Sequence, residues 1–250
     1  MMPTASTYSF NMEFFEEDFT GSMAWSVLGK RILRAAAQHA EDRGFEKVTC
    51  NGKTYLWVLS RMVIEMDKMP KTGEQGTITT WLRSAYRFFT DRCFEISDAD
   101  GHVYGRVLTI WALIDSESRE AVDLGEVLGN SIDAYIDTER KFDVERGARI
   151  RPTDMQLQAQ REVYYTDLDK NGHLNSIRYI DYALDTFPRW VYEQSRPCRV
   201  EIAYSKESYI GDTVSIMRKE AAPGTYHFAI KRGEDTACQC AITFRSKNQI

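Results

Sequence analysis

The chain has 250 residues, of which 43% are hydrophobic and 28% charged, so it can bury the core of one large or two small globular domains. Its net charge of −5 disfavours nucleic acid as a partner, because phosphate binding requires clustered lysine and arginine. No apolar run approaches the roughly 18 residues of a membrane span. The N-terminus lacks the basic start and apolar run of a secretory signal. We therefore expect a cytoplasmic protein that does not enter a membrane.

The first half predicts a strand, a long helix and further strands. Residues 7–15 are strand-like, and apolar residues then recur at the helix period across residues 23–40. Ser22 fits an N-cap for that helix, and Gly44 fits a stop. The apolar stripe consists of Trp25, Leu28, Ile32, Ala36 and Ala40. Strand-like runs follow at 55–66, 76–96 and 102–115, with a hairpin turn from Asp98 to Gly101 before the last.

The second half repeats this order. Residues 161–169 are strand-like, and residues 174–187 carry apolar side chains at the helix period. Pro188 must end that helix or start another one, because proline cannot continue a helix. Four more strand-like runs then follow, at residues 198–208, 212–220, 225–232 and 236–245.

Short segments of the two halves also align with each other. Asp18 falls against Asp169, and Gly21 falls against Gly172. We therefore predict a duplicated α+β unit, in which each copy is a long helix wrapped by an antiparallel sheet. The charged segment 138–155 is the expected linker, and the two domains would span residues 1–145 and 146–250.

The segment DLDKNGHLNS, which begins at Asp167, is the most informative part of the chain. If it is extended, side chains two positions apart point to one side, so Asp167, Asp169, Asn171 and His173 share a face. A turn seldom needs that much aligned polar chemistry, whereas an active site does. The same letters also fit a plain turn over DKNG, followed by a helix N-cap at Asn175 or the serine after it. Local sequence alone favours this second interpretation.

This segment resembles the signature of the acyl-acyl-carrier-protein (acyl-ACP) thioesterases, the plant and bacterial enzymes that end fatty-acid synthesis. Their Asp-x-Asn-x-His run at the start of the second helix matches Asp169, Asn171 and His173. Their further catalytic glutamate lies on a strand after that helix, and Glu207 in SKESYIGD holds its place. The resemblance covers nearly the whole chain and is more specific in the second half. Plant members often have cysteine after the glutamate, whereas Ser208 stands here, so a cysteine nucleophile is unnecessary.

The resemblance implies a tandem, or double, hotdog fold and thioester hydrolysis, with no cofactor and no metal. The five cysteines agree with the absence of zinc, because only Cys238 and Cys240 are close together, and reduced thiols suit a cytoplasmic protein. The first domain would supply the acyl-chain pocket, and the second would carry the catalytic residues. The tryptophans and Phe14 more often belong to a core, but some of them could line the acyl tunnel.

The resemblance also implies four catalytic residues, without settling which does which. Glu207 is the best candidate general base, because a carboxylate beside an apolar tunnel has its pKa raised towards the working pH. Asn171 can orient the attacking water. His173 could hold the nucleophile or donate to the carbonyl oxygen, and Asp169 could fix the orientation and tautomer of that histidine.

The N-terminus of the second helix is a further candidate for substrate binding. Its free N–H groups carry partial positive charge, and they could stabilise the oxyanion that develops on the thioester carbonyl. A glycine lets a substrate approach the backbone closely. The substrate-binding residues expected here are Gly172, Leu174 and Asn175.

The partner implied by the family is an acyl carrier protein bearing a fatty acyl chain. Carrier proteins of this kind are acidic, so this acidic chain would need a local basic patch to dock one. The candidates for that patch are Arg31, Arg34, Arg196, Arg199 and Lys206. Because the chain is duplicated, it could act as a monomer or pair into a homodimer.

Three other functions stay open from the sequence. One is a coenzyme A thioesterase on the same fold, and another is a non-catalytic acyl-binding protein. The third is a hotdog hydratase or dehydratase, which ranks lower because it would need an aspartate at the position of Leu168. Acyl-chain length cannot be read from the sequence.

Overall fold

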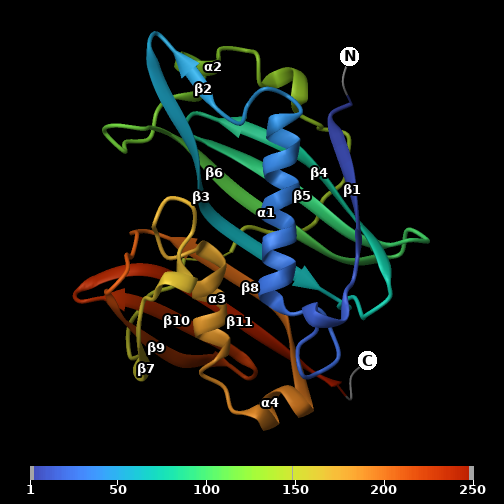
Figure 1. Cartoon of the computed structure of the whole chain (residues 1–250), viewed down its shortest axis with the longest axis vertical. Helices are drawn as coiled ribbons and strands as arrows, with labels where there is room; N and C mark the ends of the chain where they lie inside the picture. Colours follow the sequence, from blue (N-terminus) through green and yellow to red (C-terminus); the bar gives the residue numbers. More distant parts are fainter. Residues whose placement is uncertain (1–2, 148, 248–250) are drawn as a thin grey trace.

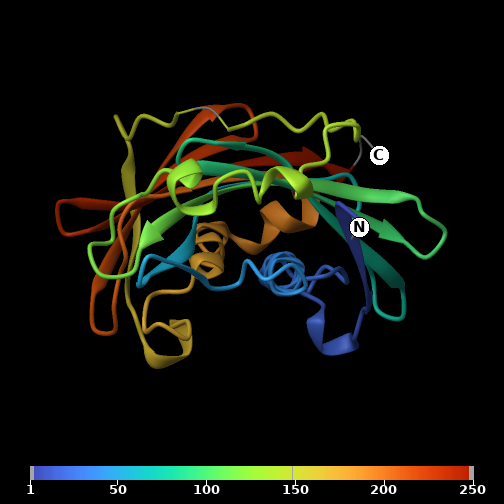
Figure 2. The same ribbon diagram turned by 90° about the horizontal axis from the view of Figure 1, so that it is seen from above.

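A single antiparallel sheet is the frame of the molecule, and two helices lie against its concave face (Figures 1 and 2). The computed structural model describes residues 3–147 and 149–247. Ten of the eleven strands follow the order β1-β4-β5-β6-β3-β8-β11-β10-β9-β7, and β2 pairs with β3 beside this path. The α+β class and the tandem hotdog architecture that the sequence predicts are therefore confirmed.

The first half contributes the strands from β1 to β6 and the long helix α1. Its first strand lies at the edge of the sheet, and β3 lies at the centre of the molecule. The elements are β1 (Ala5–Asn11), η1 (Phe14–Glu16), α1 (Trp25–Glu41), β2 (Val48–Cys50), β3 (Lys53–Met66), β4 (Gln75–Tyr86), β5 (Phe89–Asp98), β6 (Val103–Asp115), α2 (Leu124–Leu128) and η2 (Asp133–Tyr135).

The second half repeats the arrangement with β7 at the opposite edge and β8 at the centre. Its elements are β7 (Gln156–Glu162), η3 (Tyr165–Asp167), α3 (Ser176–Leu184), α4 (Arg189–Gln194), β8 (Ser195–Tyr204), β9 (Thr213–Ala222), β10 (Thr225–Arg232) and β11 (Asp235–Ser246). The two halves meet where β3 pairs with β8, from Arg61 opposite Ala203 to Glu65 opposite Arg199.

Both helices begin and end close to where the sequence predicts, with one difference. The N-cap of α1 is Ala24 rather than Ser22, because the Ser22 carbonyl is used to close the preceding turn with the N–H of Asp18. The second helix, α3, ends at Leu184, and Pro188 is the N-cap of the short α4, so the proline starts another helix as the sequence predicts. Asn175 caps α3, since its side-chain oxygen accepts from the N–H of Ile177 at 2.9 Å.

The linker crosses the convex face of the sheet, on the side opposite the helices (Figure 2). Residues 138–155 form neither helix nor strand in their described part, as the sequence predicts. Val144 is buried there against Val63, Trp81 and Leu108, so this crossing gives the outer face its own small apolar core. The domain boundary after residue 145 stays a prediction, and it falls in this segment.

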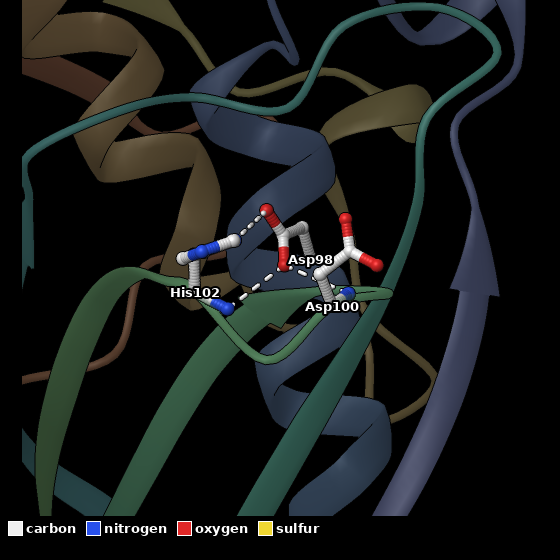
Figure 3. Close-up of side chains that lie close together, drawn as sticks. All are labelled: Asp98, Asp100 and His102. Atoms are coloured by element: carbon white, nitrogen blue, oxygen red, sulfur yellow. Dashed lines mark hydrogen bonds and ion pairs between the residues drawn. The ribbon is translucent and has the colours of Figure 1, made fainter.

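The predicted hairpin from Asp98 to Gly101 joins β5 to β6. The Asp98 carboxylate accepts from the backbone N–H groups of Asp100 and His102 at 3.0 and 2.8 Å, and it lies 3.1 Å from the His102 ring (Figure 3). The three side chains are close enough to hold a metal ion, but they lie on an exposed hairpin and the turn itself accounts for the position of Asp98. They are part of the turn and not of the predicted active site.

The two helices are in close contact at Gly29. A Cβ atom at this position would lie 2.6 Å from Cδ1 of Ile177 on α3, which is closer than packed atoms can come. Glycine costs about 1 kcal/mol relative to alanine inside a helix, so its place in the middle of α1 is explained by this contact. Ile177 is fully buried, and the same core contains Leu28 and Ile180.

We expect Gly29→Val to lower the free energy of unfolding by about 1–3 kcal/mol, because the added methyl groups force α1 and α3 apart. The measurement is chemical denaturation of the purified variant. Lys30→Val on the exposed face of α1 is the control for helix propensity, and it should cost less than about 1 kcal/mol. Equal losses in both variants would show that the contact with Ile177 does not require glycine.

Candidate active site

The segment from Asp169 to His173 is a tight turn and not an extended strand. The N–H of Asp169 donates to the carbonyl of His173 at 2.8 Å, and the N–H of Gly172 donates to the carbonyl of Asp169 at 3.1 Å. Gly172 has a φ of 80°, in the left-handed region that favours glycine. The expectation of one shared polar face is therefore wrong, and the alternative turn over DKNG is confirmed.

Asp169 builds this turn with its carboxylate. Its Oδ1 atom accepts from the backbone N–H of Asn171 at 2.8 Å and from that of His173 at 3.1 Å. Within residues 3–147 and 149–247, it makes no hydrogen bond to the histidine ring. Asp169 therefore positions the two residues through their backbone, and the expectation that it fixes the tautomer of His173 is wrong.

Glu207 reaches this turn from the loop between β8 and β9, although the sequence suggested a strand. Its Oε2 atom lies 3.3 Å from Nε2 of His173 and accepts from the hydroxyl of Tyr209 at 3.0 Å. Its Oε1 atom is ion-paired with Arg119. The side chain is 37% exposed, so Glu207 lies among polar groups and not in the apolar tunnel that the sequence led us to expect.

Arg119 and Tyr209 are the site residues that sequence reasoning missed. Arg119 lies in the turn after β6, with a φ of 62°, and it belongs to the first half of the chain. It is 88 residues from Glu207, and no motif links the two positions. Tyr209 packs its ring edge-on against the His173 ring, with centroids 5.2 Å apart, and its proximity to Glu207 in sequence was the available signal.

The backbone N–H groups around the turn are used within the protein. Those of Asn171 and His173 donate to Asp169, that of Leu174 donates to the Ser208 carbonyl at 2.8 Å, and that of Asn175 donates to the Asp167 carbonyl at 2.9 Å. The N–H of Ile177 is bonded to the cap. Most of the donors that we expected to face an oxyanion are therefore occupied.

The three residues expected to bind substrate have structural explanations. An added Cβ at Gly172 would meet nothing within 4 Å, so the left-handed φ and not a close approach explains the glycine. Leu174 is 4% exposed and packs into the core, and Asn175 is the helix cap. Ser208 is fully buried and accepts from the Tyr179 hydroxyl at 3.0 Å, so it is a structural residue.

The side chain of Asn171 is free to contact a ligand. It is exposed and makes no side-chain hydrogen bond with the part of the chain that the structure describes. Its amide can both donate and accept. It is separated by one residue from His173, whose ring contacts Glu207.

The first half contains the same turn without the reactive side chains. The N–H of Asp18 donates to the carbonyl of Ser22, four residues on, as that of Asp169 donates to His173. Its Oδ1 atom accepts from the N–H of Thr20, two residues on, at 2.8 Å. Gly21 has a φ of 75°. Matching these hydrogen bonds between the repeats places Thr20 at the position of Asn171 and Ser22 at that of His173. The N–H of Met23 donates to the Pro70 carbonyl, as that of Leu174 donates to the Ser208 carbonyl, so Met69 takes the position of Glu207.

A cavity of about 260 Å³ lies between α1 and the sheet of the first half, and it extends to Lys170 in the turn. Its α1 wall has small side chains, among them Ala36 and Ala40, and its sheet wall includes Trp57 and Trp111. These two tryptophans therefore line a space and not a closed core, whereas Phe14 is 74% exposed and belongs to neither.

Most cations of the expected docking patch are already paired. Arg31 binds Glu16, Arg199 binds Glu65 and Glu201, Lys206 binds Asp235, and Arg196 donates to a backbone carbonyl. Arg34 is exposed and makes no ion pair within the described residues. Lys170 is the exposed cation nearest the turn.

No helix among the described residues is long and apolar enough to cross a membrane.

Two family models match this chain. The acyl-ACP thioesterase N-terminal domain matches residues 4–130, and the acyl-ACP thioesterase C-terminal domain matches residues 150–249. Among curated proteins, a chloroplastic acyl-ACP hydrolase of Cuphea viscosissima is 27% identical over 221 residues, which cover 81% of this chain and 51% of that protein. The chain spans about half the length of the curated relatives it matches.

Solved structures agree over almost the whole chain. An acyl-ACP thioesterase from Bacteroides thetaiotaomicron is 39% identical, with a TM-score of 0.90 over 97% of this chain and 98% of that chain. A 12:0-ACP thioesterase from Umbellularia californica shares the fold at 14% identity, with a TM-score of 0.83 over 99% of both chains. This chain therefore belongs to the acyl-ACP thioesterase family of hydrolases, with the tandem hotdog fold of that family.

Proposed function

We propose that this protein hydrolyses the thioester of a fatty acyl-ACP and releases a free fatty acid and ACP. The observation that carries the proposal is the contact between Glu207 and His173 at 3.3 Å. His173 belongs to the same turn as Lys170, which lines the cavity, so the turn connects a candidate base to a space for an acyl chain. In this proposal the first repeat holds the acyl chain, and the second supplies the reacting groups.

Glu207 is the general base of the proposed reaction. A water molecule next to its carboxylate loses a proton to Glu207 as the oxygen attacks the thioester carbonyl. The tetrahedral intermediate then collapses, the C–S bond breaks, and the thiolate leaves and takes up a proton. His173 already faces Glu207 through Nε2, so it orients the carboxylate and shares the proton rather than binding the carbonyl with that atom.

Asn171 is the group best placed to contact the water or the oxyanion. Its amide is free, whereas the backbone donors of the turn are bonded within the protein. One well-placed donor contributes about 3–4 kcal/mol to transition-state stabilisation, or roughly a hundred- to a thousandfold in rate. Arg119 and Tyr209 are positioning residues, because they hold the two oxygens of Glu207.

We expect Glu207→Gln and His173→Ala to reduce thioester hydrolysis by at least two orders of magnitude while the protein remains folded, because each removes a proton-handling group. The assay is free-thiol release from acyl-ACP, with thermal unfolding as the test of folding. Glu234→Gln makes the same chemical change on an exposed turn and should leave the rate unaltered. Near-wild-type rates in both folded variants would end the assignment.

A second prediction separates positioning from charge at Asp169. Asp169→Ala should lower the free energy of unfolding by about 1–3 kcal/mol and kcat by at least tenfold, since the backbone of Asn171 and His173 loses its acceptor. Asp169→Asn should restore most of kcat, because an amide oxygen accepts the same two hydrogen bonds.

Asp18→Ala is the matched control for that loss of an acceptor. It removes an acceptor of two hydrogen bonds from the corresponding turn of the first repeat, one from the N–H and one from the hydroxyl of Thr20, so it should destabilise the protein similarly while kcat is unchanged. If Asp169→Asn is as inactive as Asp169→Ala, the negative charge itself is needed and the positioning role is wrong.

The acyl carrier is proposed to be ACP rather than coenzyme A, on the strength of family membership. Lys170 in the turn and Arg34 on α1 are exposed and make no ion pair within the described residues, so they are candidates for docking. An acidic carrier protein presents its charge over a surface, so docking should depend on salt.

We expect kcat/KM to be higher for acyl-ACP than for acyl-CoA, and Lys170→Glu to lower the acyl-ACP value about tenfold at low ionic strength and less at high ionic strength. Lys141→Glu, an equal charge change on the linker, is the control. Equal use of both carriers, with no effect of Lys170→Glu, would instead favour an acyl-CoA thioesterase.

A further inference from the structure

The cavity beside the candidate active site has a polar end. Most of its wall is apolar, but Arg92 and His39 also line it. Arg92 is 8% exposed, His39 is fully buried, and neither has a part in the proposed hydrolysis. Burying a cation in the wall of an acyl-chain pocket costs free energy unless a group in the pocket binds to the cation.

The Arg92 guanidinium has no counter-ion. Within residues 3–147 and 149–247 its side chain makes no hydrogen bond and no ion pair, and its Nη1 atom is covered without a partner. Burial and the nearby Arg43 lower the pKa of Arg92 to about 10, so it stays charged at neutral pH. The neighbouring buried Asp91 is different, because it is paired with both Arg83 and Arg146. Glu46 also lines the cavity but is exposed and does not pair with Arg92.

His39 adds a second unsatisfied atom next to Arg92. Its Nε2 atom lies 3.2 Å from the carbonyl of Thr4, while its buried Nδ1 atom has no partner. Burial and the charges of Arg92 and Arg43 lower the pKa of His39 to about 3, so the ring is neutral at physiological pH. Arg43 also lines the cavity, and its buried Nε atom has no partner either. Buried polar groups are normally bonded, and three such atoms at one place indicate a missing partner.

The polar end lies on the side of the cavity away from the catalytic turn. The lining residues form a row across the sheet, from Trp57 on β3 through Trp111 on β6 to Arg92 on β5. β3 borders the second repeat, which carries Lys170, and β5 is two strands further out, or about 10 Å at the usual strand spacing. His39 contacts Thr4, next to the edge strand β1. A chain entering beside Lys170 would therefore reach Arg92 with its distal part.

We propose that the acyl group taken by this enzyme carries an oxygen substituent near its distal end, a hydroxyl or a carboxylate, which accepts hydrogen bonds from Arg92. This rests on the proposed function, and it narrows the substrate class of the same site. A plain alkyl chain would cover the guanidinium and leave it without water or a counter-ion. A pocket with buried donors rejects a ligand that lacks the matching group far more strongly than it rejects a small change in size.

The test uses the whole chain and thioesters whose acyl chains end in a methyl, a hydroxyl or a carboxyl group. The three kinds are compared at equal acyl-chain length, and the comparison is repeated for a series of acyl-chain lengths. At the best length we expect kcat/KM to be at least tenfold higher for one of the oxygenated chains than for the plain chain. Arg92→Met should reduce that ratio at least tenfold, while Arg106→Met, a surface arginine on the adjacent strand β6, should leave it unchanged. Comparing the rates for the hydroxyl-ended and carboxyl-ended thioesters identifies which substituent Arg92 binds.

Binding of the free acids gives a readout that does not depend on hydrolysis. Calorimetry with the plain, ω-hydroxy and ω-carboxy acids should show the same preference, and Arg92→Met should remove it. Removing an unpaired buried charge should not lower the melting temperature, so loss of folding is not the expected cause.

The two proposals can fail separately. If no thioester is cleaved but Arg92-dependent binding of oxygenated acids persists, the hydrolase assignment fails and this inference stands. Equal or better use and binding of the plain chain at every length, or an unchanged ratio in Arg92→Met, would overturn the inference.

Discussion

The pairing of β3 with β8 is the interaction on which the rest of the molecule depends. It joins two copies of one unit into a continuous sheet and places the helices α1 and α3 next to each other on the concave face. Gly29 allows the helices to meet without a gap. The same junction brings Arg119 of the first repeat to Glu207 of the second, so neither repeat contains the whole candidate site by itself.

The two repeats share their scaffold but differ in their side chains. In both, the carboxylate of an aspartate before the helix accepts from the backbone N–H two residues on, and a glycine occupies the left-handed position. These shared contacts use the backbone, so the side chains between can differ, and in the first repeat the Thr20 hydroxyl also donates to Asp18. The second repeat has Asn171 and His173 at these positions, and the first has threonine and serine. The turn therefore fixes the backbone, and the chemistry depends on the side chains at the positions of Asn171 and His173.

The fold was largely predictable from the sequence, because the helix period, the proline after the second helix and the hairpin at Asp98 are local signals. The site was predictable only in part. The separation of His173 and Glu207 matched a family pattern, and the structure brings the two together. The geometry of residues 169–173 was left open between a strand and a turn, since alternate polar residues fit both until Gly172 is seen to have positive φ. Arg119 and the pairing of the docking cations depend on tertiary contacts that no local pattern encodes.

The loss of reactive groups from the first repeat has a consequence for how the interior is used. Two identical repeats would present two equivalent centres, each with room for only its own ligand. With threonine, serine and methionine at the matching positions, the first repeat lacks the groups that we propose for hydrolysis, and the cavity beneath its helix is the space that we propose for the acyl chain. In that proposal the duplication separates a head-group site from a tail site within one polypeptide, whose relative placement cannot change by dissociation.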